Sequence, residues 1–595
     1  MTVLQALDRY YERMAERGEA ESPGYSREKI GFAIVLSPDG EPVDVIDLRD
    51  HSDRKPQPAQ IEVPAAVKRT AGILPNLFWD KTSYALGRTA AEGRRTAEEH
   101  AAFRSLHLDS LQGIDDPGLL ALTRFLESWE PERFDAAPFT SEMLDANIVF
   151  RLEGEHQFIH QREAAKSIIQ ARSGGEAAKA FCLITGASAP IRRLHPTIKG
   201  VEGAQSSGAA LVSFNLDAFT SYGKDQGANA PTSEAAAFRY GAALNRMLDR
   251  NSRNRMTRPV GDATVVFWAD TSRLEEAEAA EQLFGFMFDP PNDESERAKV
   301  GDALEKLMAG RPVASLAPDL NEKTTFHVLG LSPNAARLSV RFWLSDTFGA
   351  FARRLAEHYA DLQIEPLPRP WKPPAVSFLL AKTTALQENF SAIPHLLAGE
   401  MTRAILTGTR YPRTLLTAVV TRLRAGDDPS TGWHAAAIRA VLARESRLGS
   451  QHRPDFDPTK EPPMSLDRAS TNAAYNLGRL FAALETAQRL ALGKVNATIR
   501  DRYFGAASAT PARVFPLLMR GVQSHVGKLR KEGKGGWIER EIEEIFDRLP
   551  PELPRSLRLE NQGRFAIGYY HQRKAQFAGR TEAEIESGEG DDGDE

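Results

Sequence analysis

The chain has 595 residues and a formal net charge of -5 at pH 7, with 75 Lys and Arg residues against 80 Asp and Glu residues. A chain of this length is too long for one hydrophobic core and should form about two to four domains. The single cysteine, Cys182, excludes a disulfide within the chain and a zinc site built from clustered cysteines. It fits a reducing compartment, so we expect a cytoplasmic protein. No apolar run is long enough to span a membrane, so we expect no membrane partner.

The charge is distributed unevenly along the chain. Residues 582–595 are acidic at more than half of their positions and contain no Lys or Arg, so we expect 581–595 to be an acidic disordered tail. Between residues 464 and 574 there are 19 Lys and Arg residues against 11 Asp and Glu residues. A polyanion such as a nucleic acid could therefore bind in that region.

The first part of the chain alternates helical and extended patterns. Apolar residues at helical spacing predict helices over 1–17, 92–129 and 161–172. Short β-branched and aromatic runs predict strands at 31–36, 43–48, 61–64, 180–184, 209–214, 264–268, 325–329 and 337–343. The turn Ser37-Pro38-Asp39-Gly40 predicts that the first two strands form a hairpin.

The strongest change in composition is the proline-rich segment 366–374, which we interpret as a linker. Beyond it the pattern is helical, with helices expected at 394–407, 411–425, 435–444, 473–492 and 515–532. The sequence thus predicts an α+β fold. A mixed α/β region with antiparallel strands covers 1–365, and an all-helical bundle covers 375–580.

The segment 191–208 is a polar loop where core would be expected. Its polar side chains interleave with small residues, which suits phosphates and base edges better than a packed interior. The loop either contacts nucleic acid, which we favour, or is a structural polar loop. The candidate contacts are Arg192, Arg193, Lys199, Gln205, Ser206 and Ser207.

This loop and four other blocks resemble the large subunit of the type I-C CRISPR Cascade surveillance complex, a member of the Csd family of CRISPR-associated proteins. The blocks are 67–80, 191–215, 331–343, 496–505 and 568–573. They are spread in order from about Leu4 to about Lys574, so chance similarity is a poor explanation.

The resemblance implies that the N-terminal region recognises the short motif that flanks the target in duplex DNA. The loop between 67 and 81 carries amide and cationic side chains of the types that read bases and hold phosphates. The alternative is a solvated loop over a buried Trp79. The candidate residues in this loop are Lys68, Arg69, Asn76 and Lys81.

Further cations could follow the displaced strand or the guide RNA. Near the C-terminus they alternate with aromatic residues such as Tyr503 and Tyr570, a combination that suits a single strand. The alternative is that the aromatic residues are core and the cations merely exposed. The candidates are Arg246, Arg250, Arg253, Arg255, Arg500, Arg502, Lys528, Arg530, Lys531, Lys534, Arg573 and Lys574.

The resemblance also implies partners and a second product. The expected partners are a CRISPR guide RNA, target duplex DNA with its displaced strand, backbone and RNA-processing subunits, a small subunit and a helicase-nuclease. In this family the small subunit is made by internal translation, and Met464 lies just before a predicted helix. A fragment 464–595 would be a free basic bundle, whereas Met401 and Met519 would cut into helices.

Motifs for catalysis are weak, so we expect a non-enzymatic protein without cofactors. The sequence has no phosphate-binding loop, HExxH motif or nucleophile elbow. One alternative is a metal-dependent nuclease that uses His156, His160, Glu153 and Glu155. Another is a purely structural scaffold that contacts only protein.

Overall fold

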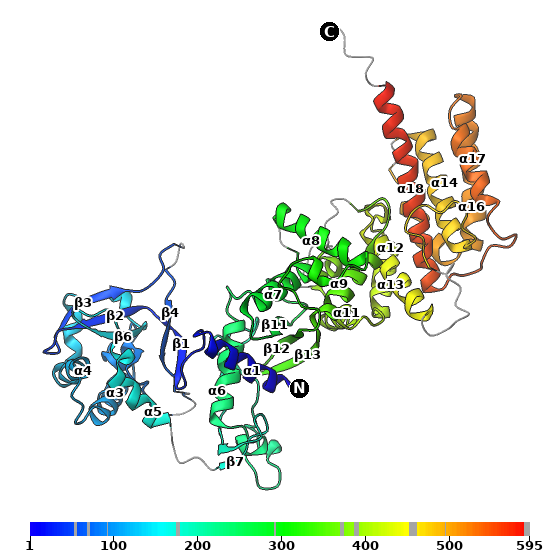
Figure 1. Ribbon diagram of the computed structural model, residues 1–595. Helices are drawn as coiled ribbons and strands as arrows, with labels where there is room; N and C mark the ends of the chain where they lie inside the picture. Colours follow the sequence, from blue (N-terminus) through cyan, green and yellow to red (C-terminus); the bar gives the residue numbers. More distant parts are fainter. Residues whose placement is uncertain are drawn as a thin grey trace, which may run out of the picture. The chain divides into compact units, whose positions relative to one another are not determined.

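The computed structural model describes residues 1–52, 56–67, 69, 72–91, 93–173, 179–290, 293–368, 374–385, 392–450, 461–493 and 496–587. The chain forms two compact units (Figure 1). Unit 1 comprises Met1–Ile198 and Ala210–Arg246, and unit 2 comprises Lys199–Ala209 and Met247–Glu595. The chain therefore enters unit 2 at residue 199, returns to unit 1 at residue 210, and enters unit 2 again at residue 247.

A four-stranded sheet lies at the centre of unit 1. Its order is β3 (Pro42–Asp47), β2 (Phe32–Leu36), β6 (Asn147–Leu152) and β5 (Trp79–Lys81). Strand β2 pairs antiparallel with β3 and parallel with β6, and every residue of β2 is buried because the strand is central. Its apolar side chains pack with those of α4 (Pro117–Ser128) in one core.

The remaining elements of unit 1 extend this arrangement. Strands β1 (Tyr25–Ile30) and β4 (Ala59–Pro64) form an antiparallel pair. Arg239 of α6 donates to Asp8 of α1 over 2.6 Å, an ion pair that joins two helices far apart in sequence. The other bounds are α1 (Val3–Glu16), α2 (Thr82–Ala85), α3 (Thr96–Ser110), α5 (Glu163–Ser173), α6 (Glu234–Met247), β7 (Lys179–Phe181) and β8 (Ser188–Pro190).

Unit 2 begins with an antiparallel sheet backed by helices. Strands β11 (Thr264–Asp270), β12 (Thr325–Asn334) and β13 (Arg337–Thr347) follow one another in the sheet. Phe326 of β12 packs with Phe284 of α7 and Phe351 of α9, with ring centroids 4.8 Å and 6.1 Å apart. The helices of this part are α7 (Leu274–Phe288), α8 (Glu294–Met308) and α9 (Phe348–Leu362).

The rest of unit 2 is helical. Helices α14 and α18 approach closely at two glycines, because a Cβ on Gly478 would lie 1.9 Å from the Phe565 carbonyl oxygen and one on Gly568 2.1 Å from that of Tyr475. The helices are α10 (Val376–Ala381), α11 (His395–Thr407), α12 (Arg413–Arg424), α13 (Trp433–Ser450), α14 (Ala473–Leu492), α15 (Ile499–Ala509), α16 (Pro511–Lys531), α17 (Gly536–Phe546) and α18 (Leu559–Ser587).

The predicted fold class is confirmed, with local differences. The helix expected over 92–129 is two helices, because Asp116 caps α4 and Pro117 occupies its first position. The predicted linker 366–374 falls within unit 2, and its residues 369–373 lie outside the described residues. Helix α18 continues through Ser587 into the expected tail, of which 588–595 also lie outside the described residues.

In the part of the chain that the structure describes, no helix is long and apolar enough to cross a membrane.

Acid should destabilise the seam between α14 and α18. His571 is 1% exposed, its Nδ1 lies 2.9 Å from the Tyr475 hydroxyl, and burial lowers its pKa to about 3. In the unfolded chain, His571 binds a proton with the ordinary pKa of 6.5. The stabilisation that comes from keeping the buried ring neutral is therefore complete above pH 6.5 and is lost as the pH falls toward 3. The free energy of unfolding of the wild type should fall between pH 7 and pH 5. We expect this fall to be about 2 kcal/mol smaller in His571→Gln.

Urea unfolding followed by circular dichroism at both pH values measures this difference. The exposed His156→Gln is the matched control and should keep the dependence of the wild type. An equal pH dependence in His571→Gln and the wild type would contradict the prediction.

Candidate nucleic-acid interface

The loop that precedes β5 is fixed by one buried carboxylate. Asp80 is 1% exposed and accepts hydrogen bonds from the backbone N–H of Asn76 and of Lys81, each over 2.8 Å. Asp80 also forms an ion pair with the guanidinium of Arg69. These bonds hold both ends of the loop to the edge of the sheet.

Two of the residues predicted to contact DNA in this loop have structural contacts. The Arg69 guanidinium lies 4.0 Å from the ring centre of Tyr84 and donates to the Leu74 carbonyl over 2.7 Å. Asn76 is 4% exposed, and its side-chain oxygen accepts from the Val67 N–H over 2.9 Å. Lys81 is exposed, whereas Lys68 lies outside the described residues. Base or phosphate contact by these residues stays a prediction.

The polar loop 191–208 is divided between the units. Residues up to 198 belong to unit 1, where the side chains of Arg192 and Arg193 are 53% and 74% exposed. Each faces a carboxylate at long range, since Arg192 lies 4.0 Å from Glu234 and Arg193 lies 3.7 Å from Asp225. Exposed pairs at such distances contribute little, so both guanidinium groups stay accessible to a phosphate.

The other half of the loop, Lys199–Ala209, belongs to unit 2 and consists of tight turns. Gly200, Gly203 and Gly208 all have positive φ angles, of 85°, 75° and 91°. A Cβ on Gly200 would lie 2.6 Å from the Leu248 carbonyl oxygen, so this position requires glycine. The predicted contacts Gln205, Ser206 and Ser207 are exposed between these turns, and Lys199 is partly buried.

The arginine residues at the end of α6 and in the segment after it are partly occupied by contacts within the chain. Arg253 pairs with Glu278 over 2.6 Å, and Arg255 donates to the Leu248 carbonyl over 2.8 Å. Arg246 and Arg250 are exposed. Of these arginines, the latter two offer the more accessible charges.

Several C-terminal candidates belong to the core of the bundle. Arg573 is 8% exposed and pairs over 2.9 Å with Glu485, which also accepts from the Tyr569 hydroxyl over 2.7 Å. Tyr569 and Tyr570 are fully buried, and Lys574 lies 5.7 Å from the ring centre of Tyr570. These aromatic rings therefore fill the core, which was the alternative considered from the sequence.

Other C-terminal cations form ion pairs with acidic residues, donate to a backbone carbonyl, or lie at the surface. Arg500 pairs with Asp428 over 2.8 Å and with Asp501 over 3.1 Å, and Arg530 pairs with Glu539. Lys528 donates to the Ala491 carbonyl over 2.6 Å. The surface candidates are Arg502, Lys531 and Lys534, all exposed.

Helix α16 carries a row of accessible positive charge. Its sequence contains no Asp or Glu, and its exposed residues Arg513, Arg520 and Lys531 recur at intervals that place them on one side of the helix. Among the described residues, none of these three side chains pairs with an acid. The row spans about 27 Å along the helix axis, which is long enough to follow several phosphates.

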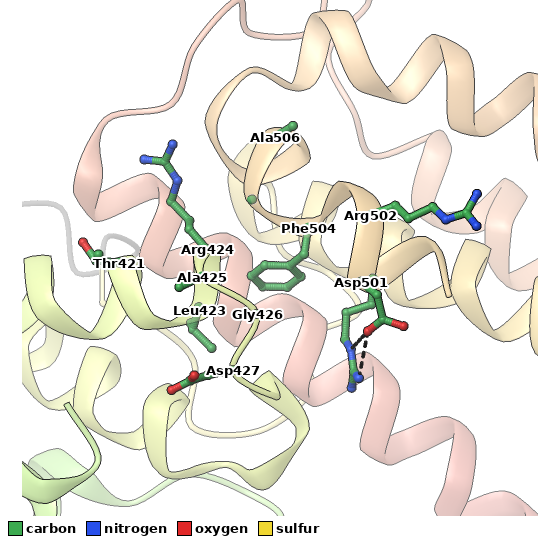
Figure 2. Close-up of a pocket in the computed structure, with 12 residues that line it drawn as sticks. Thr421, Leu423, Arg424, Ala425, Gly426, Asp427, Asp501, Arg502, Phe504 and Ala506 are labelled. Atoms are coloured by element: carbon green, nitrogen blue, oxygen red, sulfur yellow. Dashed lines mark hydrogen bonds and ion pairs between the residues drawn. The ribbon is translucent and has the colours of Figure 1, made fainter. Parts of the chain in front are cut away.

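A hollow of about 560 Å³ lies between the end of α12 and the start of α15. Figure 2 shows the Phe504 ring between these helices, with the Arg424 and Arg502 side chains extending in different directions. Asp427 and Asp501 also line the hollow. Because its walls carry both signs of charge, a polyanion has less reason to prefer it than the row on α16.

The described residues give the nuclease alternative no geometric support. They contain no group of three His, Cys, Asp or Glu side chains that could hold a metal ion. His160 is buried with its Nε2 3.0 Å from the Glu62 carbonyl oxygen, and burial lowers its pKa to about 4. Glu155 pairs with Arg162, and both His156 and Glu153 are exposed.

The candidate contacts described above thus lie in polar loops and on the basic helix α16. The profile of the family described as CRISPR-associated protein (Cas_Csd1) matches residues 7–577. The chain therefore belongs to this CRISPR-associated family, whose members are subunits of the Cascade complex. A search of curated proteins finds no match.

Sequence reasoning missed two features of the candidate interface. Arg513 and Arg520 were not singled out, although the absence of acids from 511–531 could have identified them. The fully exposed ring of Tyr222 carried no sequence signal beyond its place next to Gly223.

Proposed function

We propose that the chain is the large, non-catalytic subunit of a type I-C RNA-guided surveillance complex. The observation that carries this proposal is the row Arg513, Arg520 and Lys531 on α16, which has no acidic partner among the described residues. Membership of the CRISPR-associated family supports the same conclusion. The row would follow the phosphates of the displaced strand, since unpaired cations release counterions when they bind DNA.

Recognition of the flanking motif in duplex DNA is the second part of the proposal. Lys81, Arg192 and Arg193 in unit 1 and Gln205 in unit 2 offer accessible groups of the types that hold phosphates and read bases. The guide RNA would read the target sequence itself, so the chain needs only a short base-reading element. Binding would open the duplex, and a helicase-nuclease would supply the cleavage.

The partners follow from the same proposal. They are the guide RNA, the backbone and RNA-processing subunits, a small subunit and the helicase-nuclease recruited after the R-loop forms. A scaffold that contacts only protein would show no salt-sensitive binding to DNA, so a steep dependence of DNA binding on salt would argue against it.

Motif recognition should depend on exposed residues of the two loops. We expect Lys81→Ala or Gln205→Ala to reduce the preference of the assembled guide complex for a duplex with the flanking motif over one without it. Loss of one base contact costs roughly 1–3 kcal/mol of discrimination. The measurement is the ratio of the two dissociation constants, and the exposed Lys29→Ala is the control in unit 1.

If both loop variants assemble and keep the full ratio, the assignment of motif reading to these residues is wrong. If the wild-type complex shows no preference for the motif, the proposed function itself is wrong.

We also propose that Met464 is an internal translation start. Met464 lies in the segment before α14, and its carbonyl oxygen accepts from the Glu365 N–H over 2.7 Å. A product that begins there would keep α14 to α18 whole, including the Glu485–Arg573 pair. Met401 and Met519 lie inside α11 and α16, so a start at either would remove part of a helix.

Intact mass spectrometry of the purified complex tests this start. We expect a fragment 464–595 beside the full chain, and Met464→Ile should remove the fragment while leaving the full chain. Met519→Ile is the control and should leave it in place. A wild-type complex without a fragment that begins near Met464 would contradict the proposal.

A further inference from the structure

The loop 215–225, which we call the finger, projects the most exposed aromatic side chain of the described residues. Tyr222 at its tip is 100% exposed, and Leu216 at its base is 54% exposed. All residues of the finger except Phe219 are exposed. The finger lies wholly within unit 1, before helix α6 (Figure 1).

The tip is a closed two-residue turn. Ser221 and Lys224 exchange backbone hydrogen bonds of 3.3 Å and 2.9 Å, and the turn residues Tyr222 and Gly223 have φ angles of 52° and 69°. Two successive positive φ angles define the turn that joins tight hairpins, in which asparagine, aspartate or glycine is the usual first residue. Tyrosine is disfavoured there because its Cβ crowds the backbone.

The base of the finger is held by side chains. The Asn229 amide donates to the carbonyl oxygens of Lys224 and Gln226 over 3.0 Å and 3.2 Å. The ring of Phe219 meets that of Phe214 edge to face, with centroids 6.4 Å apart. These contacts hold the base of the finger in place, and the tip extends from this base.

The finger is also joined to the basic part of the polar loop. The Gly227 N–H donates to the Arg193 carbonyl over 3.0 Å, and a Cβ on Gly227 would lie 2.3 Å from the Arg192 carbonyl oxygen. The Arg193 guanidinium lies 3.7 Å from Asp225, an exposed acid at the end of the finger. Phosphates that meet Arg192 and Arg193 would bring bases to the same end of unit 1.

We propose that Tyr222 is a stacking residue for an unpaired nucleobase of DNA. A tyrosine that is fully exposed in a disfavoured turn gains no burial within the chain, so both faces of its ring are available to a ligand with a flat face. Bases in a duplex cover one another, and only an unstacked base offers its face to a ring. The exposed Lys224, two positions after the tyrosine, would meet the adjoining phosphate. Asp217 and Asp225 limit the attraction for phosphates, so stacking carries the binding. This inference rests on the proposed DNA-binding function.

The test compares two DNA duplexes that bind to the full-length chain. One carries a central mismatched bubble with 2-aminopurine, and the other is fully paired with the same flanks. The informative variant is Tyr222→Asn, because asparagine suits the turn but has no ring. Tyr222→Phe keeps the ring, and Phe546→Ala, which removes a ring that is 49% exposed on α17, is the matched control.

We expect Tyr222→Asn to weaken binding of the bubble duplex about tenfold and to leave the fully paired duplex unchanged. Wild type, Tyr222→Phe and Phe546→Ala should bind the bubble equally and quench 2-aminopurine, whereas Tyr222→Asn should not quench it. A photoreactive benzoylphenylalanine at position 222 of the assembled complex should crosslink to DNA.

Two results would overturn the inference while leaving the proposed function intact. One is equal binding and quenching of the bubble duplex by Tyr222→Asn and the wild type. The other is a crosslink from position 222 to a protein subunit in place of DNA, which would make the finger a protein contact. If the wild type binds neither duplex, the proposed function fails and the inference fails with it.

Discussion

Ion pairing within the chain decides which of its cations are available to a nucleic acid. The protein has 75 Lys and Arg residues, but many of their charges are matched by its own carboxylates. Arg444 is fully buried against Asp361 at 2.6 Å, and Arg573 is buried against Glu485 at 2.9 Å. Breaking such a pair by removing one partner costs about 3–5 kcal/mol, so these cations serve the fold.

Buried polar contacts also hold the helices of the C-terminal bundle in place. In the C-terminal bundle, Arg479 donates to Gln572 over 3.0 Å and Gln572 donates to Glu541 over 2.9 Å, which joins α14, α18 and α17. The neighbouring helix α17 is rich in acidic residues, whereas α16 contains none. The cations of the row on α16 therefore have no acid on their own helix to pair with.

In unit 1 the equivalent role belongs to Asp80. It fixes the loop that contains Asn76 and Arg69, and those two side chains are engaged with Val67 and Tyr84. The described residues Asn76 and Arg69 are held in place, while Lys81 is exposed at the end of the loop. Side chains held in this way lose little conformational entropy on binding, which is compatible with reading a short motif.

The sequence predicted the fold better than it predicted the contacts. Amphipathic periodicity located helices such as α14, and β-branched runs located the pair β12 and β13, because both patterns are local. Periodicity could not show that Arg573 meets Glu485, 88 positions away, or that β6 lies parallel to β2 across more than one hundred residues. The alternation of cations with aromatic residues also placed Tyr570 among the stacking candidates, although helix packing buries its ring.

The most direct test of the account is the salt dependence of single-stranded DNA binding by the full chain. The account predicts that replacing Arg513, Arg520 and Lys531 together by alanine lowers the slope of log K against log salt concentration by about 2, since each lost phosphate contact removes about 0.7. Alanine at Lys299 and Lys306, whose charges are matched by Glu296 and Asp302, should leave the slope unchanged. An unchanged slope in the α16 variant would contradict the claim that this row holds the strand.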